Sequence, residues 1–174
     1  MDGQPDGVLV RSLKQADAPR LVRMDQAITG RNRSAWYEGK LKRAITESDL
    51  NISLGAEVDG CVVGAILGSL HYGEFGLPEP IAVLDTILVD PGHGRHGIGT
   101  VLLDQLVKNL GALGIERLRT EVAWDEHDLN RFLGRRGFAP APRLVLELSL
   151  DREEPAEKLS LGCSGGVTSQ VNSS

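Results

Sequence analysis

The stretch VDPGHGRHGIGTVLLDQL, from Val89 to Leu106, decides the fold. The apolar run that leads into it, residues 81–89, predicts a buried strand, and leucines spaced three and four residues apart at its end predict an amphipathic helix. A strand that turns through glycines into a helix leaves backbone N–H groups unpaired at the positive end of the helix dipole, and glycines let a bulky anion approach them. The stretch therefore predicts a phosphate-binding loop.

Two common phosphate motifs fit this loop poorly. Gly92, Gly94 and Gly97 have the GxGxxG spacing of a dinucleotide-binding turn, with Glu121 as the acid that binds the ribose. However, Pro91 precedes the first glycine and has no N–H, and too little chain follows Glu121 for the rest of a doubly wound sheet. A P-loop is excluded because no Lys followed by Ser or Thr comes after the glycines. An NAD-type binder is a remote alternative.

The rest of the chain reads as strands and helices on both sides of this unit, which indicates an α/β domain over residues 1–150. Asp59-Gly60 is typical of the turn of a β-hairpin. The polar segment 151–174, rich in Ser and Gly and without aromatic residues, predicts a disordered tail. Strands are predicted over 8–13, 52–58, 61–72, 81–89, 116–124 and 141–150, and helices over 14–29, 33–48, 102–110 and 125–136.

The run VDPGHGRHGIGTVLL resembles the acetyl-CoA-binding motif of the GNAT superfamily of N-acetyltransferases. In that motif Val-x-Pro is followed, after two residues, by Gln/Arg-x-x-Gly-x-Gly/Ala and an amphipathic helix. Val89, Pro91, Gly97 and Gly99 match it in register. The order of predicted elements from about Val8 to about Leu150 also matches, including a short helix that ends in Gly-Phe at residues 137–138.

Three positions depart from the family pattern. Gly94 stands where the family usually has Gln or Arg, and Arg95 stands at the next place, where glycine is common. Leu133 stands where related enzymes have a Tyr that protonates the departing thiolate. We therefore do not assign that general acid to this chain.

The resemblance implies a mixed, mostly antiparallel sheet of about six to seven strands flanked by about four helices. It also implies acetyl-CoA as co-substrate, with the backbone of Ile87, Leu88 and Val89 pairing with the pantetheine arm and an N–H near Leu88 facing the thioester oxygen. The backbone N–H groups of the loop would hold the pyrophosphate: Gly94, Arg95, His96, Gly97, Ile98, Gly99 and Thr100.

Two carboxylates are candidates for the catalytic base. Glu121 matches the position at which N-terminal acetyltransferases of the superfamily place a catalytic Glu. Asp85 interrupts an apolar strand two residues before Ile87, and a carboxylate there needs a reason. The alternative for each is an ion pair with an arginine such as Arg117 or Arg119.

These features predict an N-acetyltransferase that moves the acetyl group to a primary amine by direct attack in a ternary complex. The alternative, which the departures at positions 94 and 133 keep open, is a module that binds acyl-CoA as a sensor or scaffold. The acceptor is expected to be a small-molecule or peptide amine. Its wall is expected among Trp36, Tyr37, Phe75 and Trp124, with Glu74 and Glu79 favouring an ammonium group.

Composition limits the expected binding partners and the expected cellular location. The net charge of −5 gives no footprint for nucleic acid or an anionic membrane, and no apolar window is long enough to span a bilayer, so a cytoplasmic protein is expected. A homodimer is left open. His93 and His96 lack partners with metal-ligand spacing, so no metal is expected. Cys61, inside an apolar run, is expected in the core.

Overall fold

The structure is a computed structural model that describes residues 7–46, 52–72 and 78–150. The predicted tail, 151–174, lies outside these residues. The chain forms two compact units, one up to Phe132 and one from Leu133 onward. The candidate site lies in the first unit.

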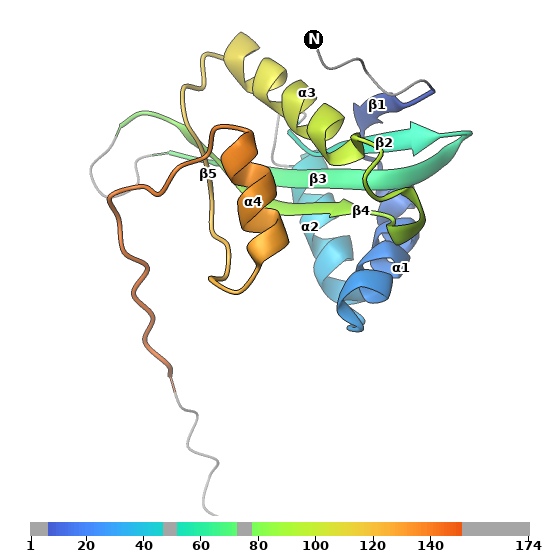
Figure 1. The fold of residues 1–174 in the computed structure, drawn as a ribbon, viewed down its shortest axis with the longest axis horizontal. Helices are drawn as coiled ribbons and strands as arrows, with labels where there is room; N and C mark the ends of the chain where they lie inside the picture. Colours follow the sequence, from blue (N-terminus) through green and yellow to red (C-terminus); the bar gives the residue numbers. More distant parts are fainter. Residues whose placement is uncertain (1–6, 47–51, 73–77, 151–174) are drawn as a thin grey trace, which may run out of the picture. The chain divides into compact units, whose positions relative to one another are not determined.

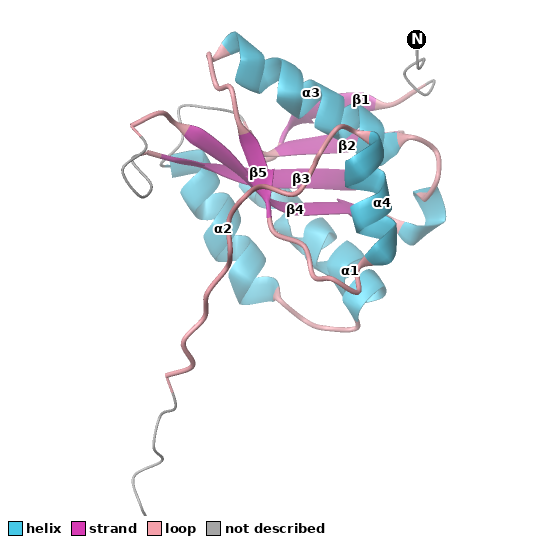
Figure 2. Ribbon diagram, turned by 60° about the vertical axis from the view of Figure 1, so that its left-hand side comes forward, coloured by secondary structure: helices cyan, strands magenta, loops and turns pink. Residues whose placement is uncertain are grey.

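A five-stranded mixed sheet forms the centre of the first unit, with the strands in sequence order. Each of the first three strands is antiparallel to the strand that follows it, and the fourth and fifth strands are parallel. Figure 2 shows the five strands side by side. They are β1 (Leu9–Ser12), β2 (Leu54–Val58), β3 (Cys61–His71), β4 (Ile81–Val89) and β5 (Leu118–Thr120).

Helices cover both faces of this sheet. Helices α1 (Ala18–Thr29) and α2 (Ser34–Thr46) lie on one face, and α3 (Ile98–Ala112) lies on the other (Figure 1). Two short 3-10 turns, η1 (Gln15–Asp17) and η3 (Pro91–His93), precede α1 and α3, and α4 (His127–Arg135) follows β5. The predicted fold class and the four predicted helices are confirmed.

The main core lies between the sheet and the first two helices. Its members are buried apolar side chains whose spacing on α1 and α2 makes one face of each helix apolar. The sheet contributes three residues of β3 and one of β4. These core residues are Leu13, Ala18, Leu21, Met24, Tyr37, Leu41, Val62, Ala65, Leu67 and Leu88.

On the other face, a glycine sets how closely α3 approaches the sheet. A Cβ on Gly64 would lie 2.7 Å from Ile98 Cγ2 and 3.2 Å from Leu102 Cδ1, closer than a side chain tolerates. The first turn of α3 therefore lies directly over β3, beside the end of β4.

The strand count is lower than predicted, and the last predicted strand is wrong. Residues 139–150 form neither helix nor strand, and the apolar side chains at 144, 145, 146, 148 and 150 are 64–88% exposed (Figure 2). Alternation of apolar and polar residues favours a strand only when a neighbouring strand supplies hydrogen bonds and packing. For the same reason β5 has three residues instead of the predicted nine.

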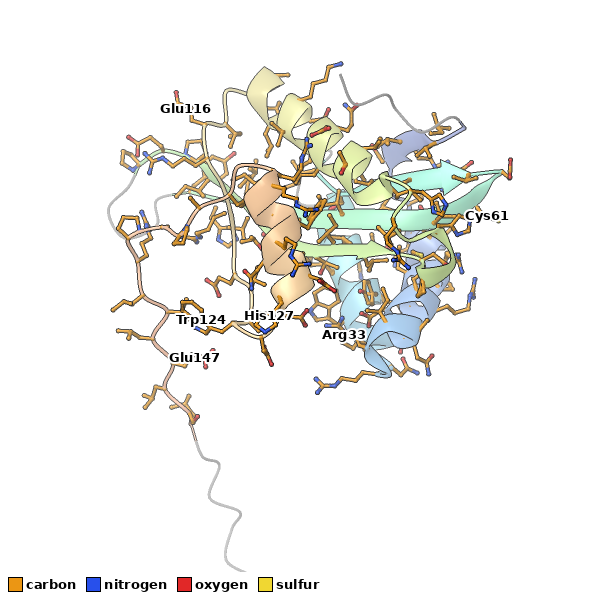
Figure 3. The ribbon with its side chains drawn as sticks, viewed as in Figure 1. Arg33, Cys61, Glu116, Trp124, His127 and Glu147 are labelled. Atoms are coloured by element: carbon orange, nitrogen blue, oxygen red, sulfur yellow. The ribbon has the colours of Figure 1, made fainter. Side chains whose placement is uncertain are left out.

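The prediction for Cys61 is also wrong. This residue opens β3 at the hairpin turn, and it is exposed (Figure 3). The turn itself forms as predicted, with Asp59 and Gly60 both at positive φ, 49° and 76°.

Candidate active site

Strands β4 and β5 diverge halfway along β4. Strand β5 pairs with Ala82, Val83 and Leu84, so in the described part of the chain the second half of β4 has a neighbouring strand on one edge only, β3. This open edge is the fork of the sheet, where a further extended chain can add.

The register shows which backbone groups face the fork. Asp90 donates its N–H to Val63 O at 2.8 Å. Antiparallel ladders alternate between residue pairs that exchange hydrogen bonds and pairs that do not, so Leu88 is the next residue bonded to β3. Ile87 and Val89 consequently turn their N–H and C=O groups toward the open edge. The N–H groups that face the fork are thus those on either side of Leu88.

Asp85 lies at a β-bulge where the fork begins. Leu67 pairs with Thr86 but the next residue of β3, Gly68, pairs with Leu84, which leaves Asp85 as the extra residue of β4. A Cβ on Gly68 would lie 2.8 Å from Val83 O, so the backbones at the bulge approach as closely as only glycine permits.

The Asp85 carboxylate is paired, but not with the arginines considered from the sequence. Lys40 of α2 lies with its Nζ 2.5 Å from Asp85 Oδ2, and the Ser69 hydroxyl donates to the same oxygen at 3.1 Å. Ser69 Oγ in turn lies 3.1 Å from His71 Nε2. Within the described residues, no hydrogen bond reaches Asp85 Oδ1.

Glu121 is the first residue after β5, which ends at Thr120. Leu84 and Thr120 form the last pair of the parallel ladder, and the Thr120 hydroxyl donates to Leu84 O at 2.9 Å. Asp85 and Glu121 come next on the two strands, so the fork separates the two candidate bases. Glu121 is exposed, with no hydrogen bond or ion pair in the described part of the chain.

The first half of the loop is a self-contained turn. Asp90 accepts the Gly92 N–H on Oδ1 at 2.8 Å, and Gly94 donates to Pro91 O at 3.4 Å. The backbone N–H of Gly92 and the Arg20 guanidinium on the other oxygen hold the pKa of the Asp90 carboxyl below its usual range, against the opposing effect of burial. Gly92 and Gly94 therefore use their N–H groups within the protein.

The second half of the loop is a cradle of free donors. Helix α3 begins after Gly97, which has φ 76°, and its first internal backbone bond is Val101 N–H to Gly97 O at 3.0 Å. Among the described residues, no acceptor receives the backbone N–H groups of 95 to 100. Six consecutive donors at a helix N-terminus suit a phosphate group.

Arg95 takes an unusual backbone conformation in this cradle. Its φ of 62° lies in the left-handed region, where residues with a side chain are strained. This explains why glycine is common at the matching place of the family motif. Arg95 is exposed.

The loop histidines do not form a metal site in the described ranges, where no group of three or more His, Cys, Asp or Glu side chains could hold an ion. His93 Nδ1 lies 3.7 Å from Asp90 Oδ1, and His96 is exposed. His93 precedes the cradle, and His96 is one of its residues.

An ion pair between a buried carboxylate and an exposed arginine orders the connection between α1 and α2, where Figure 3 shows Arg33. Arg33 Nε donates to Asp25 Oδ2 at 2.7 Å, and its Nη2 binds the other oxygen. The guanidinium lies 5.6 Å from the Trp36 ring centroid and 5.9 Å from that of Tyr37. The hydrogen bonds from Arg33 lower the pKa of Asp25 despite burial.

The residues predicted for the acceptor wall differ in their exposure. Tyr37 is fully buried in the core, whereas its neighbour Trp36 is 38% exposed. Burial, with the nearby Asp25 carboxylate, raises the pKa of the Tyr37 phenol. Trp124 is 97% exposed and Glu79 is exposed, while Glu74 and Phe75 lie outside the described residues.

Comparison with protein families gives a match to the acetyltransferase (GNAT) family over residues 20–138. The chain belongs to the GNAT acetyltransferase family. The match includes β3, β4, the loop and α3 of this GNAT protein, and it ends at the Gly-Phe pair. Comparison of the sequence with curated proteins gives no match.

Solved structures share this GNAT fold at low sequence identity. A transcriptional regulator from Bacillus halodurans C-125 has a TM-score of 0.70 and 16% identity, with 82% of this chain and 99% of that chain covered. An aminoglycoside N-acetyltransferase in complex with CoA has a TM-score of 0.68 and 14% identity, covering 82% and 94%. A ribosomal-protein-alanine N-acetyltransferase from Brucella melitensis biovar Abortus 2308 has a TM-score of 0.65 and 20% identity, covering 83% and 99%.

Several residues of this site were not found from the sequence. Lys40 and Ser69 meet Asp85 across 45 and 16 residues of sequence, and Arg20 meets Asp90 across 70. The only signal in the sequence was a basic side on the helix predicted at 33–48.

No helix in the described ranges is long and apolar enough to cross a membrane.

Proposed function

We propose that the protein is an N-acetyltransferase that moves the acetyl group of acetyl-CoA to a primary amine by direct attack in a ternary complex. One observation carries the proposal: the half of β4 that has an open edge is followed, after a short turn, by the free N–H groups of residues 95 to 100. Acetyl-CoA has an anionic end and an extended amide-containing arm, which suit the cradle and the edge respectively.

Three groups then serve the reaction. The N–H of Ile87 or Val89 polarises the thioester carbonyl, because these donors face the fork. Glu121 or Asp85 removes the proton from the attacking amine, directly or through water. With Leu133 in place of Tyr, the thiolate leaves unassisted or takes a proton from water.

The first experiment measures thermal stability with acetyl-CoA, CoA and NAD. A ligand that binds only the folded state adds about 2.7 kcal/mol at a hundred times its Kd. We expect stabilisation by acetyl-CoA and CoA. Stabilisation by NAD alone would overturn the proposal.

The second experiment follows the release of free thiol from acetyl-CoA with a panel of amines. The panel contains a polyamine, an aminoglycoside, a peptide with a free N-terminus, a lysine peptide and a small amino metabolite. Acetyl transfer to any of them supports the proposal.

The second candidate function is an acyl-CoA sensor or scaffold. The observation that favours it is an apolar, buried residue, Leu133, at the place of the family's proton donor. Stabilisation by acetyl-CoA without thiol release for any amine would select this function.

A further inference from the structure

The feature that carries a new inference is the position of Lys40. Its side chain, on α2, is only 16% exposed, and its Nζ lies 2.5 Å from Oδ2 of Asp85. Lysine is rarely buried to this extent, because ordering its long side chain costs entropy and its charge loses water. The contact places an amine of the protein itself on a carboxylate that the proposed reaction uses as base.

The surroundings of this pair fit a reaction centre. Ser69 donates to the same oxygen that Lys40 binds, so Asp85 Oδ1 is left open within the described residues. Asp85 stands two residues before Ile87, or about 7 Å along a strand, and Ile87 faces the fork. An amine held at Asp85 is thus within one side-chain length of the thioester's expected position.

We infer that Lys40 is a modification site, acetylated in cis by the protein that carries it. This inference rests on the proposed function. Lys40 takes the place at Asp85 that the ammonium group of an external acceptor would take, and so its amine is held where the proposed reaction needs an attacking nitrogen.

The step balances as follows. Lys40 gives one proton to Asp85, and its nitrogen attacks the carbonyl carbon of the thioester to form a C–N bond. The C–S bond breaks, CoA leaves as a thiolate, and the second proton from the nitrogen reaches the thiolate through water. The proton on Asp85 passes to solvent, and the products are an amide at Lys40 and free CoA.

The test is peptide mass spectrometry of the full chain after incubation with isotopically labelled acetyl-CoA. Lys108, exposed on α3, reports the uncatalysed reaction of a lysine with acetyl-CoA. We expect acetylation of Lys40 at least about tenfold faster than that of Lys108, since general-base assistance reaches this size readily. The first-order rate constant is expected to stay the same over a tenfold range of protein concentration.

Two variants sharpen the result. Asp85→Asn keeps the size of the side chain and removes the base, so acetylation of Lys40 is expected to fall to the rate of Lys108. Lys40→Arg keeps a cation beside Asp85 but cannot be acetylated, so the label at this position is expected to vanish. The comparison of Lys40 with Lys108 in the unaltered protein does not depend on how either variant folds.

The outcomes separate this inference from the proposed function. Acetylation of an external amine, with Lys40 no faster than Lys108, overturns the inference and leaves the proposed function standing. Transfer to neither Lys40 nor any amine overturns both. A rate constant that rises in proportion to protein concentration overturns the cis reaction.

Discussion

Arg20 of α1 and Asp90 at the end of β4 form an ion pair that fixes the start of the cofactor loop. The Arg20 guanidinium binds Asp90 Oδ2 and also donates through Nε to Val62 O at 2.8 Å. Because Asp90 Oδ1 receives the Gly92 N–H, one carboxylate connects a helix, a strand and the turn. The loop is thus held in place from outside the cradle.

We expect Arg20→Ala to weaken acetyl-CoA binding by about three- to tenfold, because a loosened loop must be ordered again on binding, at about 1 kcal/mol. Isothermal titration measures this change. Arg23→Ala, on the exposed side of the same helix, is the matched control and should bind like the unaltered protein. Equal affinity in both variants would show that the ion pair does not order the loop.

Arg95→Gly and Arg95→Ala separate backbone strain from charge. Glycine adopts the left-handed conformation without strain, so we expect Arg95→Gly to raise the free energy of unfolding by about 1 kcal/mol, and Arg95→Ala to leave it nearly unchanged. If the guanidinium binds phosphate, both variants lose acetyl-CoA affinity equally. Unchanged affinity in both would show that the cradle works through backbone N–H groups alone.

Gly64→Ala tests the close approach of α3 to the sheet. The new Cβ would meet Ile98 Cγ2 at 2.7 Å, so the first turn of α3 must shift, and we expect a loss of about 1–3 kcal/mol in stability. Affinity for CoA should fall as well, since the cradle moves with that turn. Gly111→Ala, in the same helix with no atom within 4 Å of its new Cβ, should instead gain up to about 1 kcal/mol. Denaturant unfolding measures both.

The Asp25–Arg33 pair should respond asymmetrically to mutation. The Asp25 side chain is 4% exposed and that of Arg33 is 42% exposed, so only Arg33 can regain water when its partner is lost. We expect Arg33→Ala to cost about 3–5 kcal/mol and Asp25→Asn about 1–3 kcal/mol. Equal losses would contradict this reading of the burial.

The same pair sets a pH dependence of stability. The pKa of Asp25 is lowered in the folded protein, chiefly by the Arg33 hydrogen bonds. Its contribution is therefore complete above the unfolded pKa of about 3.9 and disappears as the pH falls through the lower folded value. The stability difference between the unaltered protein and Asp25→Asn should be constant near neutral pH and shrink below about pH 4.

The candidate bases are tested by turnover at saturating acetyl-CoA. Because a positioned base contributes about 10²–10⁴ in rate, Glu121→Gln or Asp85→Asn should lower turnover by at least about a hundredfold, according to which residue acts. Thermal stability with acetyl-CoA checks that each variant still binds its co-substrate. Undiminished rates in both would remove the assignment.

Much of this fold was predictable because its signals are local. The spacing of leucines after the loop, the Asp59-Gly60 turn and the nine apolar-rich residues of β4 each specify their own backbone conformation. The prediction of a strand at 141–150 is wrong because alternating apolar residues indicate which side of a strand would be buried, but not which neighbouring strand would pair with it.

The site was predictable only where it is made of backbone. The free donors of the cradle follow from glycine spacing and the start of a helix, which lie within a dozen residues. The partners of Asp85 do not, because Lys40 and Ser69 reach it through packing of α2 and β3. Conversely, Tyr37 was expected to face the acceptor, but the stripe of α2 that it shares with Leu41 is the one that packs in the core.

The extra residue at position 85 also sets the phase of β4. Before it, odd-numbered residues of β4 pair with odd-numbered residues of β3, as Val83 does with Ser69; after it, even-numbered residues of β4 do so, as Leu88 does with Ala65. Leu84 and Leu88, four residues apart, therefore lie on opposite faces of the sheet, because their partners Gly68 and Ala65 are three residues apart. Deletion of this one residue would leave a regular ladder in which Leu88 still pairs with Ala65, so the core would keep its contacts while the sheet would lose the bend at which the fork begins.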